Sequence, residues 1–173
     1  MLTGKANLMR LVWQLWNKSG RNITVGNMAL NQDFKEFIQS LNANNVRYLI
    51  IGGYAVAYHG HPRYTKDLDI WLGSSRDNVT NFIKALDQFG FGSLNLTVED
   101  FLDPEQIIQL GYPPNRIDIL TDLTGVEFER CYPARVSATI DEIVINFIDL
   151  ENLKRNKKAA GRFQDLADLE NLE

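Results

Sequence analysis

Apolar residues recur with a helical period directly after Asn31, which predicts an amphipathic helix with Asn31 as its N-cap. The apolar face of this helix is formed by Phe34, Phe37, Ile38 and Leu41. A continuous apolar run at 46–51 (VRYLII) then predicts a buried strand that ends at Gly52 and Gly53. The chain therefore begins its regular structure as a helix followed by a strand.

The middle of the chain repeats this alternation. A short helix at 54–58 leads to a second strand at 67–72 (DLDIWL), and an amphipathic helix follows at 76–89. The less regular stretch after it is expected to contain a short helix over 104–110. A third strand is predicted at 116–120 (RIDIL).

The last third of the chain predicts a hairpin and two closing helices. The strands of the hairpin are expected at 135–140 and 143–147, and the helices at 150–160 and 163–172. This order of elements predicts an α/β fold, with a single mixed β-sheet flanked by helices and two C-terminal helices.

Length, charge and cysteine content narrow the class of protein. The 173 residues suffice for one domain with a sizeable core. With 18 Lys and Arg against 22 Asp and Glu, no overall basic field favours nucleic acid, although a metal site can bind phosphates without one. The single cysteine, Cys131, excludes an internal disulfide framework and a cysteine-rich zinc site. The cytoplasm is the default compartment.

The first 27 residues differ from the rest because they contain basic residues but no acidic ones. Their apolar part, 8–16, is interrupted by Arg10 and Gln14 and is too short to span a membrane; no signal peptide or membrane association is expected. Two interpretations stay open: a basic arm of the domain, and a non-native extension ahead of a natural start at Met28. We favour the second, and predict a domain spanning 28–173.

The most informative residues are acids placed in predicted strands. Asp67 and Asp69 are two apart, so their side chains project to the same face of the strand. Asp118 is likewise an acidic residue within a predicted strand, in the otherwise apolar run 117–120. Aspartate is disfavoured in strands, and carboxylates this close repel each other unless a cation lies between them. Mg²⁺ or Mn²⁺ is expected, because hard cations take carboxylate oxygens.

Three converging carboxylates suit two-metal phosphoryl transfer, in which the ions activate the attacking oxygen and stabilise the leaving group. Gly52 and Gly53 add a bare backbone at a strand end, where phosphates can approach closely. A lone Asp-x-Asp is usually a solvated edge or a turn, and a lone Gly-Gly is usually a strand-end turn. Together, and in this order along the chain, they predict a phosphoryl-transfer site.

These motifs resemble those of the nucleotidyltransferase superfamily that includes DNA polymerase beta. The segment 50–72 is similar to its signature of Gly-Gly or Gly-Ser followed by Asp-x-Asp, and 116–120 is similar to its later strand with the third acid. Within the superfamily the chain most resembles the small bacterial nucleotidyltransferases related to type IV toxin–antitoxin toxins. The residues similar to their closing motif are Lys157, Arg162, Asp165 and Asp168.

The resemblance implies roles for individual residues. The implied metal ligands and catalytic carboxylates are Asp67, Asp69 and Asp118. The implied contacts to the nucleotide phosphates are Gly52, Gly53, Lys157 and Arg162. From its loop position, Arg63 is a further candidate for the triphosphate, with a simple loop salt bridge as the alternative. His59 is expected to make a local hydrogen bond rather than to bind metal.

The activity implied is Mg²⁺-dependent transfer of a nucleoside monophosphate from an NTP to a hydroxyl of RNA, such as tRNA, of a protein or of a small molecule. A cognate antitoxin or other partner protein is also implied. Two departures count against a toxin's substrate: the larger C-terminal domain of those toxins has no counterpart, and Gly-Gly replaces a phosphate-binding serine. The alternative is a catalytically degenerate domain that binds a nucleotide or a partner.

Overall fold

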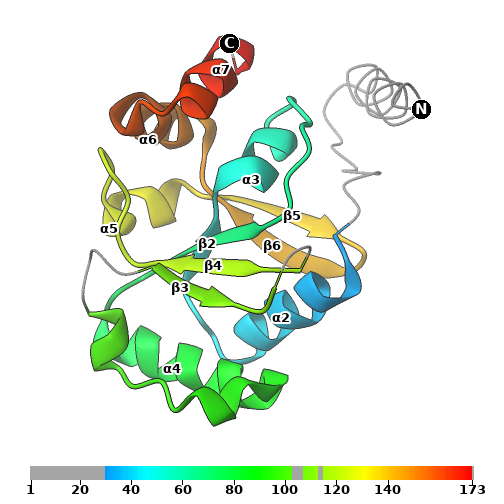
Figure 1. Cartoon of the computed structure of the whole chain (residues 1–173), viewed down its shortest axis with the longest axis vertical. Helices are drawn as coiled ribbons and strands as arrows, with labels where there is room; N and C mark the ends of the chain where they lie inside the picture. The colour runs from blue at the N-terminus through cyan, green and yellow to red at the C-terminus, as the bar shows by residue number, and fades with distance from the viewer. Residues whose placement is uncertain (1–29, 103–106, 113–114, 173) are drawn as a thin grey trace.

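The computed structural model describes residues 30–102, 107–112 and 115–172 of the chain. Its centre is one six-stranded sheet with the strand order β3-β4-β2-β1-β6-β5 (Figure 1). The strands are β1 (Tyr48–Ile50), β2 (Leu68–Leu72), β3 (Ile107–Leu110), β4 (Ile117–Leu120), β5 (Val136–Ile140) and β6 (Ile143–Phe147). Since β2 and β4 pair in parallel, as do β1 and β6, while the other neighbours are antiparallel, the predicted mixed sheet is confirmed.

Helices lie on both sides of this sheet in the view of Figure 1, with α2 and α4 below it and α3, α6 and α7 above it. Their bounds, with those of the short α5, are α2 (Gln32–Ala43), α3 (Gly52–Tyr58), α4 (Arg76–Leu86), α5 (Phe128–Cys131), α6 (Leu150–Ala160) and α7 (Phe163–Asn171). The two predicted C-terminal helices are present, and they pack against each other.

The first helix forms for the reasons that the sequence indicated. Asn31 caps α2, because its Oδ1 accepts a hydrogen bond from the backbone N–H of Phe34 at 2.8 Å. The four apolar residues of the helix face are buried. Among them, Phe37 packs edge-on against Phe82 of α4, with the ring centroids 6.3 Å apart. Burial of this aromatic layer holds α2 and α4 against one face of the sheet.

The predicted helix over 104–110 is wrong for the residues that the structure describes. Residues 107–110 form the edge strand β3, antiparallel to β4, with Ile108 opposite Ile119 and Leu110 opposite Ile117. Leu110 is buried, whereas Ile107 is largely exposed. Such a short edge strand is stabilised by pairing with β4 rather than by its own periodicity.

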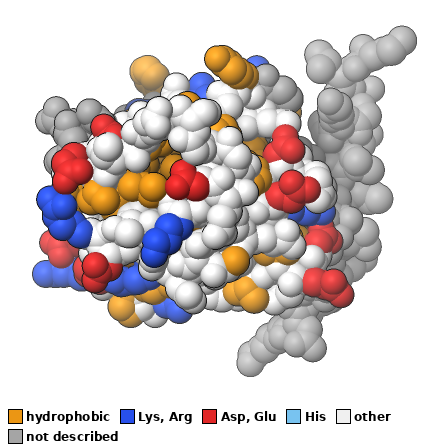
Figure 2. Space-filling model, turned by 90° about the horizontal axis from the view of Figure 1, so that it is seen from below, with side chains coloured by type: hydrophobic (Ala, Val, Ile, Leu, Met, Phe, Trp, Pro, Cys, Tyr) orange, Lys and Arg blue, Asp and Glu red, His pale blue; other side chains and the backbone are white. Residues whose placement is uncertain are grey.

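The remaining boundaries shift by at most three residues, and the largest shift is the end of α4 at Leu86 instead of residue 89. Asp67 immediately precedes β2 instead of opening it, and α3 begins at Gly52. Residues 1–27, predicted as an extension, lie outside the described residues, so that prediction is neither supported nor contradicted. Among the helices that are described, none combines the length and the apolar character needed to cross a membrane. Figure 2 shows acidic and basic side chains intermixed on the face seen from below.

Candidate active site

The pairing of β2 with β4 places two of the predicted acids side by side. Asp69 lies directly opposite Asp118 in the parallel register, and Asp67 precedes β2 on the same strand face. The pKa of Asp69 is raised to about 6, first by burial and then by the negative charges of Asp118 and Asp67. The three acids therefore share one electrostatic environment.

An arginine that the sequence analysis did not single out lies between two of these acids. The Arg116 Nη2 donates to Asp67 Oδ2 at 2.6 Å and to Asp118 Oδ2 at 3.0 Å. Its Nε lies 2.9 Å from Asp118 Oδ1, an ion pair without hydrogen-bond alignment. The spacing was a usable signal, because residues 116 and 118 are two apart in a strand and so face the same side.

The donor set matches the chemistry of a hard divalent cation. All the candidate ligand atoms are carboxylate oxygens, and Asp67 Oδ1 and Asp118 Oδ1 are buried without a hydrogen-bond partner in the described part of the protein. Within the same residues, however, no group of three acidic, histidine or cysteine side chains is arranged to hold one metal ion. Asp67 and Asp118 instead both contact the guanidinium of Arg116.

Gly52 brings the backbone of the β1–α3 junction against Asp69. A Cβ on Gly52 would lie 2.0 Å from Asp69 Oδ2, and the φ of +59° at this position also favours glycine. A Cβ on Gly53 would lie 2.7 Å from the Cβ of Thr65, in the loop that leads to β2. Gly52 is thus required for close packing against Asp69, and Gly53 for close packing against Thr65, whatever their contact with a phosphate.

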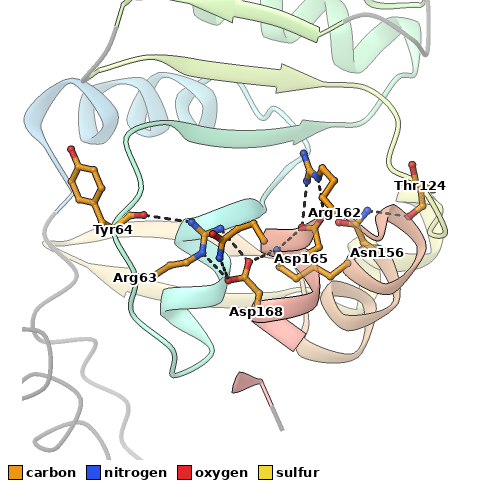
Figure 3. Close-up of polar contacts among 9 residues, drawn as sticks. Arg63, Tyr64, Thr124, Asn156, Arg162, Asp165 and Asp168 are labelled. Atoms are coloured by element: carbon orange, nitrogen blue, oxygen red, sulfur yellow. Dashed lines mark hydrogen bonds and ion pairs between the residues drawn. The ribbon is translucent and has the colours of Figure 1, made fainter. Parts of the chain in front are cut away.

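The predicted cations gather in a second cluster, which joins the C-terminal helices to the loop before β2 (Figure 3). Arg63 donates to both carboxylate oxygens of Asp168, at 2.8 and 3.2 Å. Lys157 donates to Asp168 at 2.7 Å and to Asp165 at 3.1 Å. Arg162 donates to Asp165 at 2.6 Å. We call these five residues the ion network.

Members of the ion network differ in what they offer to a ligand. The side chain of Lys157 is only 4% exposed and is enclosed with both aspartates, whereas that of Arg162 is 79% exposed. Arg63 and Arg162 both favour ionisation of Asp69 and lower its pKa against the larger effects that raise it. The two arginines therefore act on the charge of Asp69, whereas Lys157 is buried in contact with Asp165 and Asp168.

His59 makes a hydrogen bond, as predicted, but to a residue that is distant in the sequence rather than local. Its Nε2 lies 2.7 Å from the carbonyl oxygen of Ile148, and the pKa of the imidazole is lowered by burial. This contact ties the end of α3 to the segment between β6 and α6. His59 thus helps to hold the segment between β6 and α6 against the end of α3.

Comparison with solved structures identifies the fold. An antigenic nucleotidyltransferase-like protein from Paracoccidioides brasiliensis superposes with a TM-score of 0.50 and 16% sequence identity, over 83% of this chain and 77% of that chain. The chain has a nucleotidyltransferase-like fold. No protein-family profile and no curated protein sequence matches the chain. The predicted relation to DNA polymerase beta and to the toxins is therefore still a prediction, because likeness at this identity shows the nucleotidyltransferase-like fold alone.

Proposed function

We propose that the protein is a Mg²⁺-dependent nucleotidyltransferase that transfers a nucleoside monophosphate from an NTP to a hydroxyl acceptor. The observation that carries the proposal is the pairing of Asp69 with Asp118 on adjacent parallel strands, with Asp67 one residue before β2. Acidic side chains that lie together in a partly buried site destabilise the fold unless a cation compensates their charge. The nucleotidyltransferase-like fold supports this interpretation of the carboxylates.

Each residue of the site has its own role in the proposed reaction. Asp67 and Asp69 would hold Mg²⁺ or Mn²⁺ jointly, and Asp118 would complete the site and accept the proton of the attacking hydroxyl. When bound, the metal supplies electrophilic stabilisation of the charge that develops on the phosphoryl oxygens. Arg63 and Arg162 would bind the triphosphate through charge-assisted hydrogen bonds, and so orient it for displacement of pyrophosphate.

Lys157 takes a different part in this proposal. Its ammonium is engaged with Asp165 and Asp168, and those two aspartates in turn hold Arg162 and Arg63. Lys157 would therefore act on the triphosphate indirectly, by fixing the direction of the two arginines. An RNA such as tRNA, a protein or a small molecule would supply the hydroxyl, in a cytoplasmic toxin–antitoxin or similar system.

The test is a calorimetric titration with each of the four NTPs, with and without Mg²⁺. The wild type is compared with Asp69→Asn and Asp118→Asn, and with Asp122→Asn as a matched control, because Asp122 is exposed just beyond β4. We expect Mg²⁺-dependent binding by the wild type and the control, and its loss in the two site variants. A folded wild type that binds no NTP would refute the enzyme and favour a degenerate, partner-binding domain.

A further inference from the structure

The guanidinium of Arg116 lies where the proposed function calls for a cation. It contacts Asp67 at 2.6 Å and reaches both oxygens of Asp118, at 2.9 and 3.0 Å. A planar fork of this kind matches carboxylates well and neutralises part of their mutual repulsion. The guanidinium thus compensates the negative charge of two of the acids, whereas a divalent ion would compensate the charge of all three.

We propose that Arg116 is an internal counter-ion, which occupies the carboxylate site in the metal-free protein and is exchanged for the divalent cation. This inference rests on the proposed function, because it presupposes that the carboxylates take up a metal. Binding of the ion would release the guanidinium from Asp67 and Asp118. Those two side chains would then join Asp69, which takes no part in the arginine fork.

The local structure allows this exchange without movement of the sheet. The backbone of Arg116 is held in place, because its carbonyl oxygen accepts a hydrogen bond from the N–H of Leu68 at 3.0 Å. Its side chain is 28% exposed, although its Nε is buried. In the proposed exchange, a change of side-chain rotamer would move the guanidinium toward this exposed side.

The arrangement has a consequence for metal affinity. Every ion that binds must first displace charge-assisted hydrogen bonds, so Arg116 lowers the apparent affinity of the site. The same contacts of Arg116 stabilise the metal-free protein, because they compensate the charges of Asp67 and Asp118 when no ion is bound. Removal of the guanidinium should therefore strengthen metal binding and weaken the metal-free fold.

The experiment measures Mn²⁺ binding to metal-free protein by electron paramagnetic resonance, for the wild type, Arg116→Gln and Arg76→Gln. Arg76 is the matched control, because it is an exposed arginine of α4 that pairs with Glu99 and has no part in the proposed site. We expect Arg116→Gln to bind Mn²⁺ about tenfold more tightly than the wild type. The control should change the affinity by no more than about threefold.

A second measurement follows thermal unfolding with and without Mn²⁺. The melting temperature of Arg116→Gln should fall below that of the wild type without metal, and should rise more when metal is added. If Arg116→Gln does not fold, Arg116→Lys decides the question: it keeps the charge but lacks the fork, and should still bind Mn²⁺ more tightly than the wild type.

Two results would overturn the inference. Unchanged or weaker Mn²⁺ binding by the Arg116 variants, with clear binding by the wild type, would show that Arg116 supports the metal site, and would leave the proposed function standing. Absence of Mn²⁺ binding in both proteins would refute the exchange as well. The NTP titration of the wild type would then judge the proposed function separately.

Discussion

Replacing Lys157 by methionine removes the ammonium that two buried aspartates share, while an unbranched side chain of similar length still fills the space. The side chains of Asp165 and Asp168 are 3% and 1% exposed, so neither carboxylate can turn to water when the ammonium is lost. Each keeps one arginine partner, Arg162 or Arg63. The Lys157→Met variant is thus left with a buried cluster that has lost its central cation.

The size of the effect follows from this geometry. Removing one partner of a buried ion pair costs about 3–5 kcal/mol when the remaining charge is left uncompensated. Because Arg162 and Arg63 still compensate part of the charge here, we expect the lower end, about 3 kcal/mol. For a chain of this length, that corresponds to a fall of roughly 6–12 °C in the melting temperature. The exposed neighbour Lys158 offers a matched control on the same helix, and Lys158→Met should stay within about 0.5 kcal/mol of the wild type.

The loss should depend on pH in a defined direction. Burial alone would raise the pKa values of Asp165 and Asp168, but hydrogen bonds from Lys157 and from the arginines outweigh it and hold both pKa values below the usual range. A carboxyl with a lowered pKa stabilises the fold above its unfolded pKa of about 4, and this stabilisation is lost as the pH falls through the folded value. The difference between wild type and Lys157→Met should therefore be full at pH 7 and shrink below about pH 4.

Urea unfolding followed by circular dichroism at pH 7 and at pH 3.5 measures both effects. A difference of less than about 1 kcal/mol at pH 7 would refute the reasoning, because it would mean that the network contributes no net stability. A difference that does not change with pH would also contradict it. In that case the cost would come from packing around Lys157 rather than from its charge.

Two further predictions concern Asp69. Because the pKa of Asp69 is raised to about 6, its stabilising contribution is present below about pH 4 and is lost as the pH rises through 6. In the presence of a chelator at pH 7.5, the free energy of unfolding of Asp69→Asn should therefore exceed that of the wild type by roughly 3 kcal/mol, whereas at pH 4 the two should be equal. Urea unfolding at the two pH values measures this difference. Gly52→Ala should lower the free energy of unfolding by about 1–3 kcal/mol and weaken NTP binding, since its Cβ would lie 2.0 Å from Asp69 Oδ2. Gly90→Ala is the control for backbone strain alone, because Gly90 has a φ of +106° and its Cβ would have no atom within 4 Å. Equal losses of stability in the two variants would exclude the clash with Asp69.

The sequence predicted the elements whose stabilisation is local. The helix capped by Asn31 and the two C-terminal helices follow from period and capping, which act within a few residues. The edge strand β3 was missed, because it depends on pairing with β4. The strand order that places Asp69 beside Asp118 is likewise a long-range property, so their proximity was a hypothesis until the sheet was seen.

Two residues of the site carried signals in the sequence that were not used. Arg116 is two positions before Asp118, which places both side chains on one face of the strand. Lys157 follows the fully buried Leu153 by four residues, so it lies on the inward face of α6, whereas Lys158 points outward. The helical period therefore distinguishes the buried Lys157 from its exposed neighbour Lys158. The ion partners of each cation still required the packing of α7 against α6.

The ion network connects the C-terminal helices to the carboxylates through a single loop. Arg63 belongs to the segment between α3 and β2, and Asp168 of α7 fixes its guanidinium with two hydrogen bonds. The same segment contains Thr65, which Gly53 contacts closely, and ends at Asp67. The contacts of Arg63 thus join α7 directly to the segment that leads into β2. The C-terminal helices are therefore part of the proposed site, although none of the three acids lies on them.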